Sequence, residues 1–217
     1  MKSKVLMLAL ATTVFALTSK AQGKASFGIR AGINFQNING DDPNGNELDY
    51  NLKTGFHIGV TAEVPVAPEF YVQPGLLFST KGAKDKIPNA DDRKINISYL
   101  EIPINFLYKP TLGTGKLLLG VGPYLAFAVG GKTKQGSNSD DFEFDNKTTL
   151  AKYVQAPYAK RFDAGANFLA GYELSNKVSF QLNAQLGLVK INTKITDYPD
   201  KGKAKNTGFG FSVGYRF

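Results

Sequence analysis

The chain of 217 residues contains no cysteine, no tryptophan and a single histidine. Without cysteine it forms no disulfide bond and carries no lipid-anchored cysteine after an export signal. Its only sustained apolar run, from Val5 to Leu17, is about a dozen residues long and is too short to span a bilayer as a helix. No other stretch shows a convincing helical period of about 3.6 residues, so we expect no helical domain.

The N-terminal segment has the pattern of a secretory signal. Two lysines precede the apolar run, and Ser19 and Ala21 place small residues at the −3 and −1 positions of a cleavage site. We expect residues 1–21 to be a cleaved signal peptide and residues 22–217 to form one domain.

The formal charge of +8 falls to +5 in the mature chain, because the signal carries three lysines and no acidic residue. The remaining basic residues lie mostly in polar stretches, where they indicate contact with anionic lipopolysaccharide or plain solvation. For an exported protein we expect no nucleic-acid partner.

Apolar and polar residues alternate in eight segments of the mature chain. Because the side chains of a strand point alternately to its two faces, each segment predicts a strand with one apolar face. Most segments are close to the length of about nine to eleven residues that a tilted membrane strand needs. The segments are 27–35, 55–64, 70–80, 99–108, 117–129, 162–174, 178–188 and 208–217.

The connections between these segments alternate strictly between short and long. The short ones are 65–69, 109–115 and 175–177, and the long ones are 36–54, 81–97, 130–161 and 190–207. Short turns at one rim and long loops at the other are typical of bacterial outer-membrane barrels. The last segment would aggregate as a free edge, which favours a closed barrel in which it pairs with the first. We therefore predict an all-β fold, an eight-stranded antiparallel up-and-down transmembrane β-barrel with short periplasmic turns and long extracellular loops.

A soluble barrel of the lipocalin kind is the competing architecture. Such a barrel would expose its polar face to water, and a solvated face would carry many lysine and glutamate residues. The polar face is instead rich in glycine, asparagine, glutamine and serine, as a narrow lumen requires. Aromatic residues also gather near the segment ends, like the interfacial girdles of membrane barrels. The composition favours a barrel in a Gram-negative outer membrane.

Four short motifs carry a resemblance to a known family. They are Gln-Pro-Gly-Leu at the start of 73–82, Tyr-Leu-Glu-Ile-Pro within 97–106, Gly-Val-Gly-Pro-Tyr-Leu at 120–125 and Phe-Asp-Ala-Gly at 162–165. In this order they resemble the outer-membrane β-barrel family of Bacteroidota that includes PorT-like proteins. The final strand, which ends at Phe217, is similar to the assembly signal that bacterial barrels present to the barrel-assembly machinery.

Pro74, Pro103 and Pro123 fall inside predicted strands, where each removes a hydrogen-bond donor from the sheet. Proline in sheets is normally confined to edges and bulges. We expect bulges or distorted pairing near these three positions.

Eight polar residues are predicted to face the lumen as a structural network. An eight-stranded barrel is only wide enough for its own side chains, and charges kept from water must be paired. We expect two groups of mixed sign that together plug the lumen. Strand directions assign Arg30, Glu63, Glu173 and Arg216 to the periplasmic half, and Lys81, Glu101, Asp163 and His57 to the extracellular half.

Patterns for catalysis and metal binding are weak. His57 could form a rim acyltransferase or protease site with Asp163 and a serine, but no motif of catalytic spacing surrounds it. A hydrogen-bonded lumen histidine is the favoured interpretation. The acidic stretches 41–47 and 140–145 lack the alternating ligands of a calcium loop and indicate solvated loops. We expect no enzymatic activity, no cofactor and no bound metal.

The longest connection, 130–161, is the candidate recognition loop, because long loops in compact domains are usually functional or disordered. Its aromatic residues exceed what solvation requires, which predicts either a hairpin that extends the barrel or a docking patch. They are Phe142, Phe144, Tyr153 and Tyr158. In the alternative, Phe142 and Tyr153 pack on each other across an extended hairpin. We expect a structural or recognition role with an extracellular or envelope partner. Passive transport of a small solute is the alternative, and a rim enzyme is a more distant one.

Overall fold

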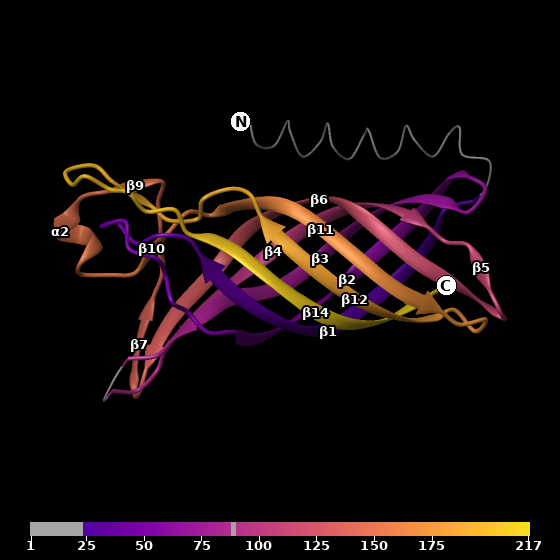
Figure 1. Cartoon of the computed structure of the whole chain (residues 1–217), viewed down its shortest axis with the longest axis horizontal. Helices are drawn as coiled ribbons and strands as arrows, with labels where there is room; N and C mark the ends of the chain where they lie inside the picture. The colour runs from indigo at the N-terminus through magenta and orange to yellow at the C-terminus, as the bar shows by residue number, and fades with distance from the viewer. Residues whose placement is uncertain (1–23, 88–89) are drawn as a thin grey trace.

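The computed structural model describes residues 24–87 and 90–217, so the expected signal peptide lies outside the described residues. Eight long strands form a closed antiparallel barrel (Figure 1). Each strand pairs with its neighbour in the chain, and β14 pairs with β1 to close the sheet. The predicted fold is therefore confirmed, including the pairing of the last strand with the first. The strands are β1 (Ser26–Asn39), β2 (Lys53–Ala67), β3 (Phe70–Asp85), β4 (Arg93–Tyr108), β6 (Gly115–Gln135), β11 (Phe162–Glu173), β12 (Val178–Gly187) and β14 (Lys205–Arg216).

Shorter elements lie at the two ends of the barrel. Figure 1 shows β5 and the C-terminus at the end with short turns, and the other short elements among the long loops. Within the described residues, no helix is long and apolar enough to cross a membrane. The short elements are β5 (Thr111–Leu112), β7 (Asn138–Asp141), β8 (Glu143–Phe144), β9 (Lys147–Thr148), α2 (Leu150–Tyr153), β10 (Tyr158–Ala159) and β13 (Lys194–Ile195).

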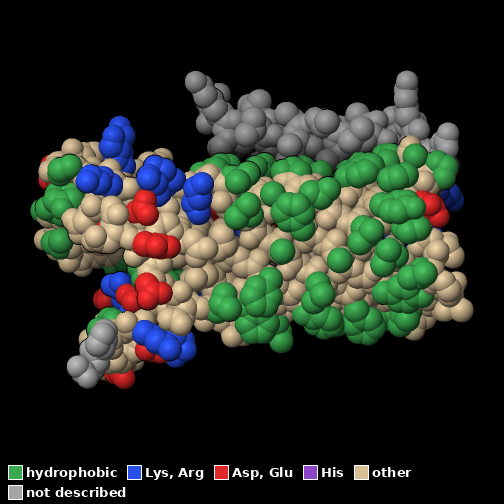
Figure 2. Space-filling view, in the orientation of Figure 1, with side chains coloured by type: hydrophobic (Ala, Val, Ile, Leu, Met, Phe, Trp, Pro, Cys, Tyr) green, Lys and Arg blue, Asp and Glu red, His purple; other side chains and the backbone are tan. Residues whose placement is uncertain are grey.

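The barrel is apolar outside and polar inside. Phe27 and Leu182 are each 63% exposed, whereas Asp163 and Ser212 are 0% exposed. Figure 2 shows apolar side chains spread over the barrel body, with most charged side chains gathered at the end that carries the long loops. This distribution suits a lipid environment and is the reverse of a soluble barrel. The end with long loops is then extracellular, and the end with short turns is periplasmic.

Several strands run farther beyond the membrane region than the alternation predicts. β3 continues to Asp85 and β4 begins at Arg93, so much of the expected loop 81–97 is a hairpin. β6 continues to Gln135 and folds back into β7. Beyond the membrane the outer face of a strand meets water, so the outward apolar pattern ends at the membrane rim while the strand itself goes on.

The three prolines interrupt the sheet without shifting its register. Pro74, Pro103 and Pro123 each keep a partner on the following strand, while pairing with the preceding strand skips two residue pairs and then resumes in register. In an antiparallel sheet a residue exchanges both of its hydrogen bonds with one neighbour, so a missing donor affects one ladder only. The register shifts lie elsewhere, between Pro65 and Ala67 and between Ser98 and Tyr99. Of the two expected outcomes, bulges or distorted pairing, the structure shows distorted pairing at these three prolines.

Candidate functional site

Near the periplasmic end, Lys109 joins two buried carboxylates of the lumen. Its Nζ lies 2.6 Å from Glu63 Oε2 and 3.0 Å from Glu173 Oε2. Arg216 donates two hydrogen bonds to Glu173, from Nη2 at 2.6 Å and from Nε at 3.2 Å. Three residues of the expected network therefore meet here, but around a lysine that sequence reasoning assigned to a periplasmic turn. The alternation of the strand could have indicated this position. Lys109 lies two residues after Leu107, whose side chain faces the lumen, and is therefore expected on the same face.

Higher in the lumen, Lys81 lies between two other carboxylates. Its Nζ is 2.8 Å from Glu101 Oε2, an ion pair without hydrogen-bond geometry, and 3.4 Å from Asp163 Oδ2. The ammonium group also lies 4.0 Å from the centre of the Tyr124 ring, whose hydroxyl donates to Asp163 at 3.3 Å. Asn206 Nδ2 donates to Asp163 Oδ2 at 3.0 Å. The cluster brings together three of the expected residues and leaves none of these charges isolated.

Arg30 joins neither carboxylate cluster. Its Nη1 donates to Gln181 Oε1 at 3.3 Å and lies 3.5 Å from Asn183 Oδ1. It lines the same small cavity as Glu63, Glu173 and Arg216, so it lies with the expected periplasmic group, although within residues 24–87 and 90–217 it forms no ion pair. Neutral amide groups take the place of an acidic partner.

His57 is held by an amide and a hydroxyl. Its Nδ1 lies 2.7 Å from Asn34 Oδ1, and its Nε2 lies 3.0 Å from Ser212 Oγ. Because an amide oxygen only accepts, Nδ1 donates to Asn34 and the Ser212 hydroxyl donates to Nε2. This order of groups has the connectivity of a catalytic relay. However, Ser212 is 0% exposed and the cavity beside His57 measures only about 20 Å³, so an acyl substrate has no room. Asp163, the carboxylate considered for this site, is engaged by Lys81 instead.

Toward the extracellular end the lumen becomes apolar. Ile97 and Tyr99 of β4 pack with Ala159 and Ile191, two loop residues that are each 3% exposed. The long loops therefore fold inward and close the extracellular mouth of the barrel. Sequence reasoning missed this cluster, because its members come from distant stretches that were assigned to solvated loops.

The long loops are joined into one folded unit, here called the head and defined as loops 40–52, 136–161 and 188–204 with the strand ends around them. β8 pairs with β10 in parallel within the 136–161 loop, and β9 pairs with β13 of the 188–204 loop. Lys203 Nζ lies 3.2 Å from Asp41 Oδ2, which ties the 188–204 loop to the 40–52 loop. Cross-loop contacts of this kind hold the head in one arrangement.

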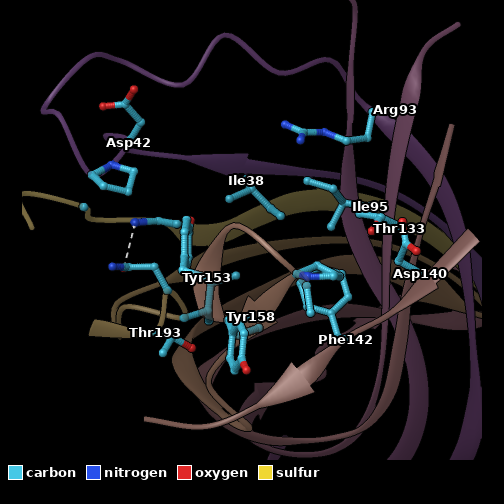
Figure 3. Close-up of a pocket in the computed structure, with 18 of the residues that line it drawn as sticks. Ile38, Asp42, Arg93, Ile95, Thr133, Asp140, Phe142, Tyr153, Tyr158 and Thr193 are labelled. Atoms are coloured by element: carbon cyan, nitrogen blue, oxygen red, sulfur yellow. Dashed lines mark hydrogen bonds between the residues drawn. The ribbon is translucent and has the colours of Figure 1, made fainter. Parts of the chain in front are cut away.

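The head contains a pocket of about 710 Å³, drawn in Figure 3. Phe142, Tyr153 and Tyr158 of the candidate recognition loop line it, and the rings of Tyr153 and Tyr158 stack with their centroids 6.5 Å apart. Phe144 lies outside the pocket lining and packs on the buried cluster below, with the Arg161 guanidinium 4.7 Å from its ring. The structure thus brings three of the four candidate residues to one cavity.

These aromatic residues form neither an exposed patch nor a Phe142–Tyr153 pair. All four are partly buried, and Phe142 pairs instead with Phe144, with ring centroids 6.2 Å apart. The β6–β7 hairpin does extend the barrel, as one of the sequence alternatives predicts. The aromatic rings of the loop are directed toward the pocket and the closed mouth, whereas Leu150 and Val154 stay exposed.

The electrostatics of the pocket combine neutral phenols with a fixed negative charge. Burial raises the pKa of the Tyr50 and Tyr153 hydroxyls above the ordinary tyrosine value. Hydrogen bonds from the turn that follows Asp42, foremost from the backbone N–H of Asn46, lower the pKa of that carboxyl. At neutral pH the pocket therefore presents protonated tyrosines beside an ionised aspartate.

Comparison with known proteins bears out the barrel. No curated protein matches the chain at a significant level. Among solved structures, the crystal structure of Ail, the attachment invasion locus protein of Yersinia pestis, matches with 13% identity and a TM-score of 0.39, over 90% of this chain and 100% of that chain. The family model for the outer membrane protein beta-barrel domain matches residues 19–192, which is more than half of the chain. The chain therefore belongs to the outer membrane protein beta-barrel domain family and is a β-barrel of the outer membrane.

Proposed function

We propose that this protein is a non-conducting, non-enzymatic outer-membrane barrel whose extracellular head serves in recognition. One contrast supports this most directly. Two cavities inside the lumen measure about 20 Å³ each, whereas the pocket of the head measures about 710 Å³. Binding sites for small molecules usually occupy about 300–1,000 Å³. Between the lumen and the head, the space for a ligand therefore lies in the head and not along the barrel axis.

Passive transport fits the lumen less well. A solute crossing the barrel would have to separate the ion pairs of Lys109 and Lys81 and displace the apolar cluster around Ile97. Removing the partner of a buried charge costs about 3–5 kcal/mol, so two such clusters in series oppose an open path. A rim enzyme is disfavoured by the lack of substrate space at His57.

The proposal also includes the subfamily of the barrel, its assembly signal and its contact with lipopolysaccharide. The Tyr-Leu-Glu-Ile-Pro motif at 99–103 supports a place among the PorT-like barrels of Bacteroidota. β14, as the closing strand, suits a role for Phe217 as a signal to the barrel-assembly machinery. Lys134 and Arg161, toward the extracellular ends of β6 and β11, supply positive charge that suits lipopolysaccharide phosphates.

Export by a cleaved signal gives a direct prediction. Protein extracted from outer membranes should have the intact mass of a chain that begins at Gln22. The variant Ala21→Arg removes the small residue at the −1 position and should accumulate at the mass of the uncleaved chain. An outer-membrane form of the unaltered protein that retains residues 1–21 would show that this segment is not a cleaved signal.

Two measurements separate recognition from transport. In planar lipid bilayers the refolded full chain should show no stepwise conductance of porin size, because its lumen is filled. In cells, replacing residues 137–158 with a Gly-Ser linker should keep the altered gel migration of an unboiled folded barrel, since the eight barrel strands lie outside this segment. The same replacement should abolish any phenotype that the full chain restores to a deletion strain.

Porin-like conductance would favour transport over the proposed function. If the linker variant restored every phenotype of the full chain, the 136–161 loop would be only a connection, and the recognition role would be wrong. If the linker variant lost the folded band, the experiment would be repeated with the shorter replacement of residues 146–156, which keeps Phe142 and Phe144 on the buried cluster.

A further inference from the structure

The pocket in the head combines an aliphatic floor with aromatic walls. Ile38 and Ile95 belong both to the pocket lining and to the buried cluster that closes the lumen. Figure 3 shows Phe142, Tyr153 and Tyr158 around the same space. An aliphatic floor accepts a carbon skeleton, and the faces of aromatic rings attract a cation.

Two of the charged side chains that line the pocket already have partners. Asp41 Oδ2 lies 3.2 Å from Lys203 Nζ, and Arg93 Nη2 lies 2.7 Å from Asp85 Oδ2. The positive charge of Arg93 is therefore balanced inside the head. This balance weakens the attraction that the pocket would otherwise offer to an anionic ligand.

Two other carboxylates of the lining, Asp42 and Asp140, form no ion pair within the described parts of the chain. Asp42 Oδ1 accepts hydrogen bonds from the backbone N–H groups of Asn44 and Asn46, at 2.8 and 2.9 Å, which favour its ionised form. Asp140 pairs in register with Thr133, and both residues line the pocket from one face of the β6–β7 hairpin (Figure 3). Two carboxylates without a cationic partner in the described residues therefore belong to the pocket lining, on two different loops, and that of Asp42 is turned toward its own loop.

We propose that this pocket binds a small organic cation that carries an aromatic or aliphatic body. The inference rests on the proposed recognition function and adds a chemical class of ligand to it. The carboxylates supply complementary charge, the aromatic walls supply cation–π contacts, and the aliphatic floor supplies apolar burial. The volume of about 710 Å³ suits a small molecule.

The test uses the full chain refolded in detergent and three probes that share a phenyl ring. Phenethylamine is the cation, phenylacetate the anion and phenethyl alcohol the neutral analogue, and each is titrated by calorimetry. We expect phenethylamine to bind about tenfold or more tightly than either analogue, as charge complementarity together with cation–π contact implies.

Neighbouring residues of β7 provide a matched pair of variants. Asp140→Asn should weaken phenethylamine binding by about fivefold to tenfold, because it removes one of the two carboxylates without a partner. Asp141→Asn is the control, since Asp141 lies on the opposite face of the same strand with its carboxylate 3.4 Å from Lys132 Nζ. Both aspartates are exposed, so neither change should affect folding.

Phenylacetate or phenethyl alcohol binding as tightly as phenethylamine would overturn the inference, and so would unaltered binding by the Asp140→Asn protein. Equal weakening by the two variants would also overturn it, because the effect would then be that of general surface charge. If none of the probes binds, the organic cation is the wrong ligand class. The recognition role would in that case still be tested separately by the linker replacement in cells.

Discussion

Replacing Lys109 with methionine should lower the free energy of unfolding of the barrel by about 3–5 kcal/mol. The lysine is 2% exposed, and its ammonium group lies within 3.0 Å of both Glu63 and Glu173. Methionine retains much of the volume but leaves both carboxylates without this cation. Arg216 still neutralises Glu173, so the main cost arises at Glu63, which has no other ion-pair partner in the described residues.

This loss can be measured by urea unfolding of the barrel refolded into lipid vesicles, followed by circular dichroism. Lys116→Met is the matched control, because Lys116 lies near the same rim and forms no ion pair among the described residues; its effect should stay within about 0.5 kcal/mol. Adding Glu63→Gln to Lys109→Met should recover much of the loss, since it removes the isolated charge. A Lys109→Met protein as stable as the control would show that the cluster is not needed for stability.

Gly122→Val should prevent formation of the folded barrel. Gly122 lies on the lumen face of β6, where the neighbouring strand β4 approaches closely. A Cβ atom added there would overlap the carbonyl oxygen of Ile104 and would lie 2.8 Å from the Cα of Asn105. Both obstacles are backbone atoms, so β4 and β6 would have to separate to admit the side chain.

The matched control is Gly130→Val on the same strand, because a Cβ at Gly130 meets no heavy atom within 4 Å. Outer-membrane extracts of cells expressing each variant would be run unboiled on a denaturing gel. The Gly130→Val protein should show the band of the folded barrel, and the Gly122→Val protein should lack it. Equal amounts of folded band from both would mean that the wall yields at Gly122 and that the close approach does not restrict this position.

The barrel could be predicted from the sequence because a membrane imposes a strict local rule. Every second residue of a spanning strand faces hydrocarbon, and the alternation of Phe209, Phe211 and Val213 with smaller or polar residues follows from that requirement. The polar lumen follows from the same alternation. Chain order and loop length then determine which strands pair, because each pairs with its neighbour.

The contacts inside the lumen could be predicted only in part. Strand directions placed Lys81 with Glu101 and with Asp163, which is 82 positions away, but a shared height does not by itself indicate which side chains are in contact. Lys109 lies one residue beyond the end of β4, where the polar composition also fits a turn. Arg30 lies beside the periplasmic carboxylates as expected, but nearby amides rather than an ion pair supply its hydrogen bonds.

The head was missed for a different physical reason. Backbone hydrogen bonds create the pairings β8–β10 and β9–β13, and these bonds leave no side-chain pattern in the sequence. The strand extensions of β3, β4 and β6 lie beyond the membrane, and in β4 the apolar residues change from the outer to the inner face, where Ile95 and Ile97 are buried. Composition therefore indicated polar loops, while the backbone folds these stretches into an ordered unit.

The contact between Asp41 and Lys203 joins loops that follow the first strand and precede the last. These loops become neighbours only when β14 has paired with β1, because that step brings the two ends of the sheet together. An assembly intermediate that still lacks this seam leaves the 40–52 and 188–204 loops apart and hence has no complete pocket. A ligand of the pocket would therefore distinguish closed barrels from open ones at the cell surface, and its binding would report closure of the barrel in living cells.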